Sequence, residues 1–200
     1  MTDKIDLSVI IPVYNEAATC AEIIKRVQAI SIVYEIIVVD DASTDGTIDI
    51  LEAMDNIKVI RHEKNKGKGA AVRTGLAHVQ GNYVITQDAD LEYDPNDYLK
   101  LAEPMLAGSA EVVYGSRWLN KPIEWNIHYL INQMITLFAN VFNGVFLTDI
   151  STCYKLIPTT LLQALDLRAN GFGIDAEITA KLTKNGTKIF EVPIQYAKRA

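Results

Sequence analysis

The chain is poor in cysteine, has no long apolar run and shows no excess of basic residues. Its two cysteines, Cys20 and Cys153, match neither a metal-binding nor a redox spacing, so we expect two reduced thiols in a cytosolic protein. No uninterrupted run of roughly 18 apolar residues occurs, and the sequence therefore predicts no transmembrane helix. Lys and Arg total 19 against 25 Asp and Glu, which argues against nucleic acid as the main partner, because phosphate backbones require a basic surface.

The first half of the chain alternates short apolar runs with segments of helical periodicity. Strands are predicted at residues 7–11 and 36–39, which are apolar runs, and at residues 58–60, 83–86 and 111–114. The segments that predict helices are residues 16–30 with Asn15 as cap, 48–54, 69–79 and a stretch starting at Pro95. Strands that are apolar throughout are buried on both faces, and their alternation with helices indicates a parallel sheet. We therefore expect an α/β fold with a mostly parallel, Rossmann-like sheet over residues 5–115.

Polar and acidic residues follow the ends of these predicted strands. They are residues 12–16, Asp40 and Asp41, residues 88–90, and residues 115–117. In doubly wound sheets ligands bind beyond the carboxyl ends of the strands, so we expect these residues to meet at one rim. This rim is the predicted functional site.

Three carboxylates, Asp88, Asp90 and Glu92, follow the fourth predicted strand. They repel one another unless a cation lies between them, and Mg²⁺ and Mn²⁺ prefer oxygen ligands of this kind. Turn and cap chemistry is the alternative, because aspartate suits both. The position at the end of a buried strand favours a metal site at Asp88 and Asp90, with Glu92 as an additional ligand left open.

Other rim residues suit a phosphorylated ligand. Asp40 could accept hydrogen bonds from a base or ribose, whereas Asp41 is expected to cap the next turn. Residues 66–69 (KGKG) open a predicted helix, whose start favours a phosphate, although glycines that merely turn the chain are the alternative. Arg117 follows a predicted strand and is placed to bind a phosphate with both arms of its guanidinium.

The second half of the chain is less regular. Residues 125–148 contain no formally charged residue, and one helical face of this segment is apolar. The other face is polar and carries Gln133, Thr136, Asn140 and Asn143. Such a segment could lie against a membrane or could be a buried packing helix. Residues 188–196 predict a strand at the edge of the sheet, because Pro193 interrupts them.

Six stretches occur in a consistent order: SVIIPVYNE, EIIVVDDASTDGT, NKGKGAAVRTGL, DADLEYDP, GSR and GFGIDAEI. Together they resemble the family 2 glycosyltransferases, and most closely the branch that makes polyprenyl-phosphate mannose or glucose. The resemblance implies a single GT-A domain over residues 1–200 and inversion at the anomeric carbon. It implies an NDP-sugar donor of the GDP-mannose or UDP-glucose type, a divalent cation (Mg²⁺ or Mn²⁺) and a lipid-phosphate acceptor. Peripheral contact with the cytoplasmic face of a membrane follows from such an acceptor.

The resemblance also implies roles for individual residues. Residues 5–115 would bind the nucleotide-sugar and residues 116–200 would form the acceptor side. The substrate-binding candidates are Pro12, Tyr14, Glu16, Asp40, Lys68, Asp88, Ala89, Asp90, Arg117, Asp175 and Glu177. The catalytic candidates are Asp149, Arg117 and Lys155, with Asp149 as the base if the reaction needs one. The ending VPIQYAKR resembles a point at which family members continue, so C-terminal membrane helices are expected to be missing.

The choice of acceptor decides whether a base is needed. A sugar hydroxyl requires a positioned carboxylate, whereas a phosphate monoester is already a dianion at neutral pH and needs cationic groups more than deprotonation. Transfer to a glycan or another hydroxyl acceptor is therefore the main alternative. A nucleotidyltransferase and a non-catalytic nucleotide-sugar-binding protein are further alternatives.

Overall fold

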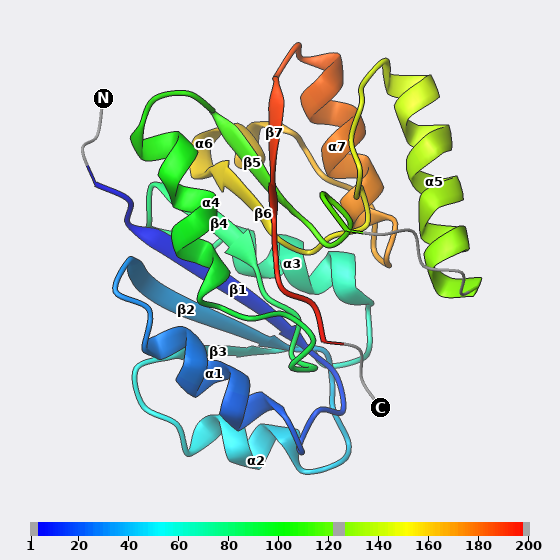
Figure 1. Ribbon diagram of the computed structural model, residues 1–200. Coiled ribbons are helices and arrows are strands. Elements are labelled where there is room, and N and C mark those ends of the chain that lie inside the picture. Colours follow the sequence, from blue (N-terminus) through cyan, green and yellow to red (C-terminus); the bar gives the residue numbers. More distant parts are fainter. Residues whose placement is uncertain (1–3, 122–126, 198–200) are drawn as a thin grey trace.

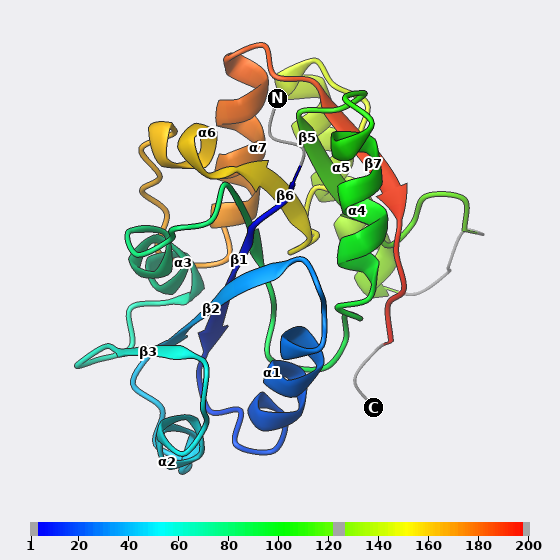
Figure 2. The same ribbon diagram turned by 90° about the vertical axis from the view of Figure 1, so that its left-hand side faces the viewer.

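The structure is a computed structural model that describes residues 4–121 and 127–197. Its centre, within those residues, is a seven-stranded sheet with the order β3-β2-β1-β4-β6-β5-β7 (Figures 1 and 2). The strands are β1 (Leu7–Val13), β2 (Val33–Asp40), β3 (Lys58–Arg61), β4 (Tyr83–Thr86), β5 (Val112–Ser116), β6 (Lys155–Pro158) and β7 (Ile189–Pro193). The helices are α1 (Cys20–Gln28), α2 (Thr47–Glu52), α3 (Lys68–Leu76), α4 (Asp97–Leu106), α5 (Ile127–Asn143), α6 (Thr159–Ala164) and α7 (Ile174–Lys184).

The sheet is mostly parallel, as the sequence predicts. Strands β3, β2, β1 and β4 pair in parallel, and so do β5 and β7. Strand β6 runs antiparallel between β4 and β5 and was not expected. Because β6 runs the other way, its first residue, Lys155, lies at the same rim as the carboxyl ends of the parallel strands. Strand β7 ends at Pro193 on the sheet edge, which confirms its predicted edge position.

Helices cover both faces of the sheet, with α1 and α4 on one side and α3, α6 and α7 on the other (Figure 2). Leu7, Val9 and Ile11 of β1 belong to the core cluster that includes α1 and α4 residues. Ile10 belongs to the cluster that includes residues of α3, α6 and α7. Neighbouring strand residues point to opposite faces, so a strand covered on both faces must be apolar throughout.

Two predicted boundaries near the rim were wrong. Strand β1 continues through Pro12 to Val13. This is tolerated because β4 pairs with β1 only as far as Ile10, so the missing N–H of Pro12 faces a side without a strand partner. Helix α1 begins at Cys20 after Thr19, not after Asn15. Asn15 has a left-handed backbone (φ 55°), and its side-chain oxygen accepts the N–H of Thr44 at 2.8 Å, which joins two rim loops.

Helix α5 places its polar side chains against the protein and its apolar side chains at the surface. Its polar side packs inward: the Asn140 side chain bonds both the N–H and the carbonyl of buried Leu147, at 3.1 and 2.8 Å. The buried Thr136 hydroxyl accepts the N–H of Ile150. Its exposed large apolar side chains are Ile127, Leu130, Ile131, Met134, Ile135, Leu137, Phe138, Val141 and Phe142. The apolar face therefore points to the outside of the molecule. Helix α5 itself lies beside α7 (Figure 1). Residues 125 and 126 of the predicted segment lie outside the described residues.

Membrane crossing requires a longer apolar helix than α5. Within the described ranges, no helix combines the length and apolar character needed to span a membrane.

Candidate functional site

A cavity of about 370 Å³ lies at the carboxyl ends of β1 and β4. It brings together side chains that the sequence predicted from three separate stretches: Pro12, Tyr14, Glu16, Lys68, Asp88, Ala89 and Asp90. It is also lined by Asp41, Asn65 and Phe172, which the sequence analysis did not select as ligands. A larger hollow of about 600 Å³ lies elsewhere, lined by residues 108–111 and 186–190, away from all predicted site residues.

Four residues of alternating charge, Asp88, Lys68, Asp175 and Lys155, form what we call the charge chain. The Lys68 ammonium lies 2.6 Å from Asp88 Oδ1 and 4.0 Å from Asp175 Oδ2, and Lys155 Nζ lies 2.6 Å from Asp175 Oδ1. Burial lowers the pKa of Lys68, but the negative charges of Asp88 and Asp175 outweigh it and hold the pKa above its usual value. The chain joins the ends of β4, α3, α7 and β6 at the rim.

Asp90 has a different environment from Asp88. Its Oδ1 accepts the backbone N–H of Glu92 at 3.1 Å, within its own turn. Burial, together with the negative charges of Asp88, Glu92 and Glu16, raises the pKa of Asp90 to about 6. The carboxylate therefore lies in a region of negative potential.

Glu92 points towards a second, smaller hollow. Its Oε2 accepts a hydrogen bond of 2.6 Å from the Tyr196 hydroxyl, and both residues line a cavity of about 200 Å³. Burial and the Glu92 carboxylate raise the pKa of Tyr196 to about 12, so the phenol stays protonated and donates. In the described part of the chain, no group of three Cys, His, Asp or Glu side chains is arranged to hold a metal ion.

Asp40, the last residue of β2, takes the capping role that was expected for Asp41. Asp40 is fully buried; it accepts the N–H of Ser43 at 3.3 Å and so caps the next turn, the role predicted for Asp41. Asp41 lines the cavity and accepts the backbone N–H groups of Lys66 and Gly67 at 2.9 and 2.7 Å.

Asp41 also accepts a hydrogen bond of 2.6 Å from the ring of buried His62. Burial raises the pKa of Asp41, but the hydrogen bonds from His62, Lys66 and Gly67 outweigh it and the net pKa is lowered. A charged carboxylate therefore fixes the loop in front of α3.

The glycines before α3 allow a close approach between two backbones. A Cβ on Gly69 would lie 2.4 Å from the carbonyl oxygen of Ala169, and one on Gly67 would lie 2.5 Å from that of Asn170. The N–H of Ala70 donates to the same Asn170 oxygen at 3.0 Å. This contact fixes the start of α3, and with it Lys68, against the loop that precedes α7.

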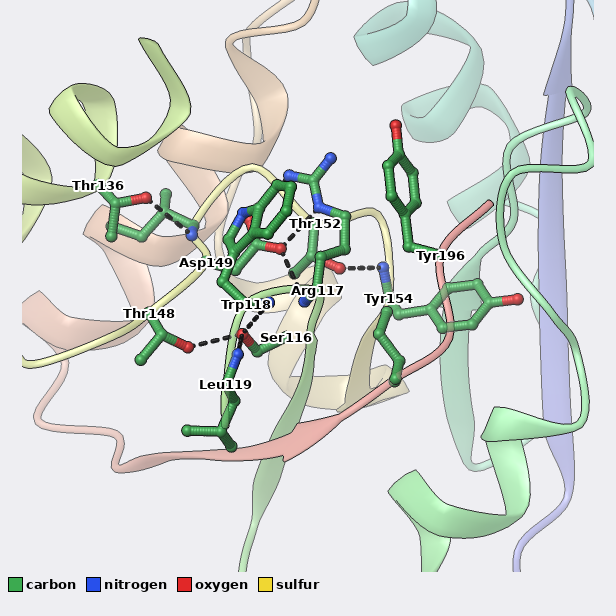
Figure 3. Close-up of polar contacts among 12 residues, drawn as sticks. Ser116, Arg117, Trp118, Leu119, Thr136, Thr148, Asp149, Thr152, Tyr154 and Tyr196 are labelled. Carbon is green, nitrogen blue, oxygen red and sulfur yellow. Dashed lines mark hydrogen bonds and ion pairs between the residues drawn. The ribbon is translucent and has the colours of Figure 1, made fainter. Parts of the chain in front are cut away.

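Arg117 and Asp149 form a buried, two-armed ion pair beyond β5 (Figure 3). Arg117 Nε donates to Asp149 Oδ2 at 2.7 Å and Nη2 donates to Oδ1 at 2.8 Å, while the Arg117 backbone N–H adds a third bond of 3.0 Å. Burial lowers the pKa of Arg117, but Asp149 outweighs it and the net pKa is raised. With three accepted hydrogen bonds from Arg117 and no solvent exposure, Asp149 fixes the position of Arg117.

Aromatic rings surround the same guanidinium. Its central carbon lies 5.2 Å from the ring of Tyr196, 5.4 Å from that of Trp118 and 5.9 Å from that of Tyr93. The rings of Trp118 and Tyr196 stand on either side of Arg117 in Figure 3. Tyr93 and Tyr196 are far from Arg117 in the chain, so no local sequence pattern indicates their contacts with it.

Glu177, the last predicted ligand, faces away from the cavity. It accepts the N–H groups of Arg168 and Ala169 at 2.9 and 2.7 Å and pairs with Lys181 at 2.7 Å. Burial raises the pKa of Glu177, but these partners outweigh it and the net pKa is lowered. Glu177 thus fixes the loop that packs against Gly67 and Gly69.

Known proteins are similar to this chain over nearly all of its length. A UDP-N-acetylglucosamine–dolichyl-phosphate N-acetylglucosaminyltransferase of Methanococcus voltae is 31% identical, with 98% of this chain and 86% of that protein aligned. Glycosyltransferase AglJ of Haloferax volcanii is 29% identical, with 96% of this chain aligned. The alignments span 63% of AglJ and 48% of the hexosyltransferase Agl6 of the same organism, so the chain corresponds to part of these relatives.

Solved structures share the fold. Glucosyl-3-phosphoglycerate synthase from Mycobacterium tuberculosis, in complex with Mn²⁺, UDP and phosphoglyceric acid, superposes with a TM-score of 0.78. The identity is 21%, and the match covers 98% of this chain and 72% of that one. The predicted α/β fold of the GT-A type is thereby confirmed. The profile of glycosyl transferase family 2 matches residues 8–164, and with the similarity of the whole chain to the Methanococcus voltae protein it shows that the chain belongs to glycosyl transferase family 2.

Proposed function

We propose that this chain is the catalytic unit of a metal-dependent, inverting glycosyltransferase that moves a sugar from a nucleoside diphosphate sugar to a polyprenyl phosphate. The observation that carries the proposal is the cavity at the ends of β1 and β4, where Lys68 lies beside Asp88 and Asp90. A diphosphate needs both a cation site and positive side chains, and the cavity offers the groups for both. Family membership supports the class of reaction.

Asp88 and Asp90 fit a hard divalent cation. Both carboxylates line the cavity, and their oxygens are the ligands that Mg²⁺ and Mn²⁺ prefer. Burial and the neighbouring carboxylates raise the pKa of Asp90, and a bound cation would offset both effects. Proteins of the same fold have been crystallised with UDP and Mn²⁺ or Mg²⁺, which supports this choice. Glu92 bonds Tyr196 instead, so we propose two protein ligands rather than three.

The acceptor is proposed to be a phosphate held by Arg117. Asp149 and the surrounding rings fix the guanidinium, which prepares it to orient an anion. A phosphate monoester has a second pKa of about 6 and attacks as a dianion without a base. This suits a site in which Asp149 is already engaged by three hydrogen bonds. The Methanococcus voltae relative, which its name assigns to dolichyl phosphate, supports a lipid acceptor.

The outward apolar face of α5 supports a membrane-bound acceptor. Its polar side is occupied by hydrogen bonds to the protein, so the exposed apolar side must meet another apolar phase or remain in water. We propose that this face rests on the surface of a bilayer and brings the acceptor to the rim. The face lacks lysine and arginine, so apolar burial rather than attraction to anionic lipids would drive the contact.

The proposed mechanism assigns positioning and charge stabilisation to the protein. When bound, the divalent cation supplies stabilisation of the negative charge on the departing diphosphate. Lys68 adds a second positive charge beside that group. Arg117 orients the attacking phosphate oxygen, and Asp149 keeps Arg117 in place. Asp175 and Lys155 hold Lys68 at the rim through the charge chain.

A transfer assay tests the proposal. Purified protein is incubated with Mn²⁺, a polyprenyl phosphate in detergent and radiolabelled UDP-N-acetylglucosamine, UDP-glucose or GDP-mannose. We expect label in the organic phase with one donor, and none with Asp90→Ala or with EDTA. The matched control is Asp55→Ala, since Asp55 is an exposed aspartate outside the cavity.

Other outcomes identify the alternatives. Transfer to a glycan acceptor without lipid labelling would indicate a hydroxyl acceptor. Pyrophosphate release from a nucleoside triphosphate and a sugar phosphate would indicate a nucleotidyltransferase. Donor binding without transfer to any acceptor, and without donor hydrolysis, would indicate a non-catalytic nucleotide-sugar-binding protein.

A further inference from the structure

The Lys68 ammonium pairs with Asp88, one of the two carboxylates that we propose as ligands of the cation. Its Nζ lies 2.6 Å from Asp88 Oδ1, and both side chains are largely buried, with exposed fractions of 15% and 24%. Both line the same cavity as Asp90. A cation bound between Asp88 and Asp90 would therefore share Asp88 with a fixed positive charge.

The Lys68 ammonium and a cation bound to Asp88 would lie a few ångströms apart and would repel each other strongly. The interaction of unit charges a few ångströms apart reaches several kcal/mol near a protein surface, and it doubles for a divalent ion. Among the described residues Asp90 takes part in no ion pair, so no side-chain cation competes for this carboxylate, in contrast to Asp88. The half-site is thus neutralised on the Asp88 side and open on the Asp90 side.

A second carboxylate keeps Lys68 in the cavity. Asp175 Oδ2 lies 4.0 Å from Lys68, and Lys155 holds the other oxygen of Asp175 at 2.6 Å. Helix α3 begins at Lys68, and its start is fixed by the close backbone contact at Gly67 and Gly69. The ammonium can therefore leave Asp88 only by rotation of the Lys68 side chain. A diphosphate that enters the same cavity is an anion and would attract the ammonium.

We propose that Lys68 makes metal binding conditional on the donor: it holds Asp88 while the cavity is free of nucleotide and moves to the diphosphate when the donor arrives, which releases Asp88 to the divalent cation. This inference rests on the proposed function, because it assumes the metal and donor sites assigned above. Its consequence is positive coupling between cation and nucleoside diphosphate, and by linkage each ligand raises the affinity for the other by the same factor.

The test measures Mn²⁺ binding by electron paramagnetic resonance without nucleotide, on wild type, Lys68→Met, Lys68→Gln and Lys68→Arg. We expect the Met and Gln variants to bind Mn²⁺ at least tenfold more tightly than wild type, because the competing charge is gone. The Arg variant retains the charge and should bind like wild type. Lys64→Met is the matched control, since Lys64 is an exposed lysine of the same loop, and it should leave Mn²⁺ affinity unchanged.

A second measurement adds UDP and GDP separately, with Mn²⁺–nucleotide binding in protein-free solution subtracted. Wild type should gain Mn²⁺ affinity with one nucleotide, and Lys68→Met should gain at least threefold less. Thermal unfolding of each variant establishes that it is folded, and Lys68→Gln can still donate a hydrogen bond to Asp88 if Lys68→Met is unstable.

Two results would overturn the inference in distinguishable ways. Equal Mn²⁺ affinities for wild type, Lys68→Met and Lys68→Gln would remove the role of Lys68 while leaving the metal site intact. Mn²⁺ binding that survives Asp90→Ala, or that is absent with and without nucleotide, would remove the metal site itself, and the inference with it.

Discussion

At the scale of single residues, buried charges determine what this rim can do. The charge chain and the Arg117–Asp149 pair are both shielded from water. In such pairs the loss of one partner leaves the other charge buried and uncompensated, which costs more than the pair itself contributes. Single substitutions at these positions should therefore change both stability and ligand binding.

The Arg117–Asp149 pair allows a direct test of this argument. Asp149→Ala should lower the free energy of unfolding by about 3–5 kcal/mol, because it leaves the Arg117 guanidinium buried without its carboxylate. Urea denaturation at neutral pH measures the change. The matched control is Arg168→Ala, which breaks the pair with Asp166, an arginine–aspartate pair of the same 2.7 Å separation whose side chains are 79% and 73% exposed. Equal losses in the two variants would contradict the argument, since the exposed pair should contribute nothing measurable.

Asp90 gives a prediction about pH. Burial and the neighbouring carboxylates raise its pKa from 3.8 to about 6, so between these values the folded protein binds more protons at this side chain than the unfolded chain does. Its contribution to stability therefore falls as the pH rises through that window, and the loss is complete above it. With EDTA present, the melting temperature of Asp90→Asn relative to wild type should rise between about pH 4 and 6 and then level off.

The control for this pH series is Asp55→Asn, at an exposed position away from the other carboxylates of the rim. Its melting temperature should follow that of wild type at every pH. Parallel curves for wild type and Asp90→Asn would mean that Asp90 has an ordinary pKa in the folded protein.

At the scale of elements, α5 has the arrangement that departs most from an ordinary surface helix. Its polar residues bond the loop that contains Leu147 and Ile150, and its apolar residues are exposed. We expect the double variant Val141→Lys, Phe142→Lys to lose at least tenfold in affinity for neutral phosphatidylcholine vesicles, because lysines resist burial at the acyl boundary. Co-sedimentation with vesicles measures the loss.

The matched control for α5 is Leu106→Lys, an exposed apolar residue at the end of α4. It should leave vesicle binding unchanged. If the α5 variant binds vesicles like wild type but changes the sedimentation of the protein without lipid, a second copy of the chain covers this face instead.

The sequence predicted some elements well and missed others for physical reasons. Strands β1, β2 and β5 were recognisable because they are mostly buried and therefore contain apolar runs, and the shorter β3 and β4 were recognisable from the apolar residues at their centres. Strand β6 was missed because it begins with a lysine and ends with a proline, Lys155 and Pro158, which leaves only two apolar residues between them. Helix α7 does carry a readable signal, since its buried Ile174, Ile178 and Leu182 recur every four residues.

The sequence could predict only those site residues that lie at the end of a single recognisable strand or helix. Asp88, Asp90 and Lys68 were found because each follows a strand or opens a helix that ends at the rim. Pairings across the molecule, such as Asp175 with Lys155, depend on where β6 enters the sheet, and no local pattern reports that. The same applies to the rings around Arg117, and to Phe172, which reaches the cavity from the loop before α7.

At the scale of the whole molecule, the two halves expected from the sequence share one core. The cluster that contains the β1 residues also contains Cys153, Tyr154, Leu156 and Ile194 from the second half. In addition, β5 pairs with β6 and β7, not with β4. We therefore propose that the chain folds as one cooperative unit.

A fragment of residues 1–120 tests this proposal. It lacks both strand partners of β5 and leaves one edge of β4 unpaired, so we expect no cooperative urea transition and strong binding of a hydrophobic dye. The complete chain under the same conditions is the control. A fragment with a sharp transition and native-like circular dichroism would show that the first half is an independent domain.

The late position of β6 has a consequence for synthesis on the ribosome. Strand β4 emerges early, but the neighbour that covers its open edge is made only when translation reaches residues 155–158. At about 5–20 residues per second this delay lasts several seconds, during which a nearly complete parallel sheet exposes a strand edge in the crowded cell. Slowing translation within residues 87–154 should lengthen that exposure and increase the nascent chain's demand for chaperones.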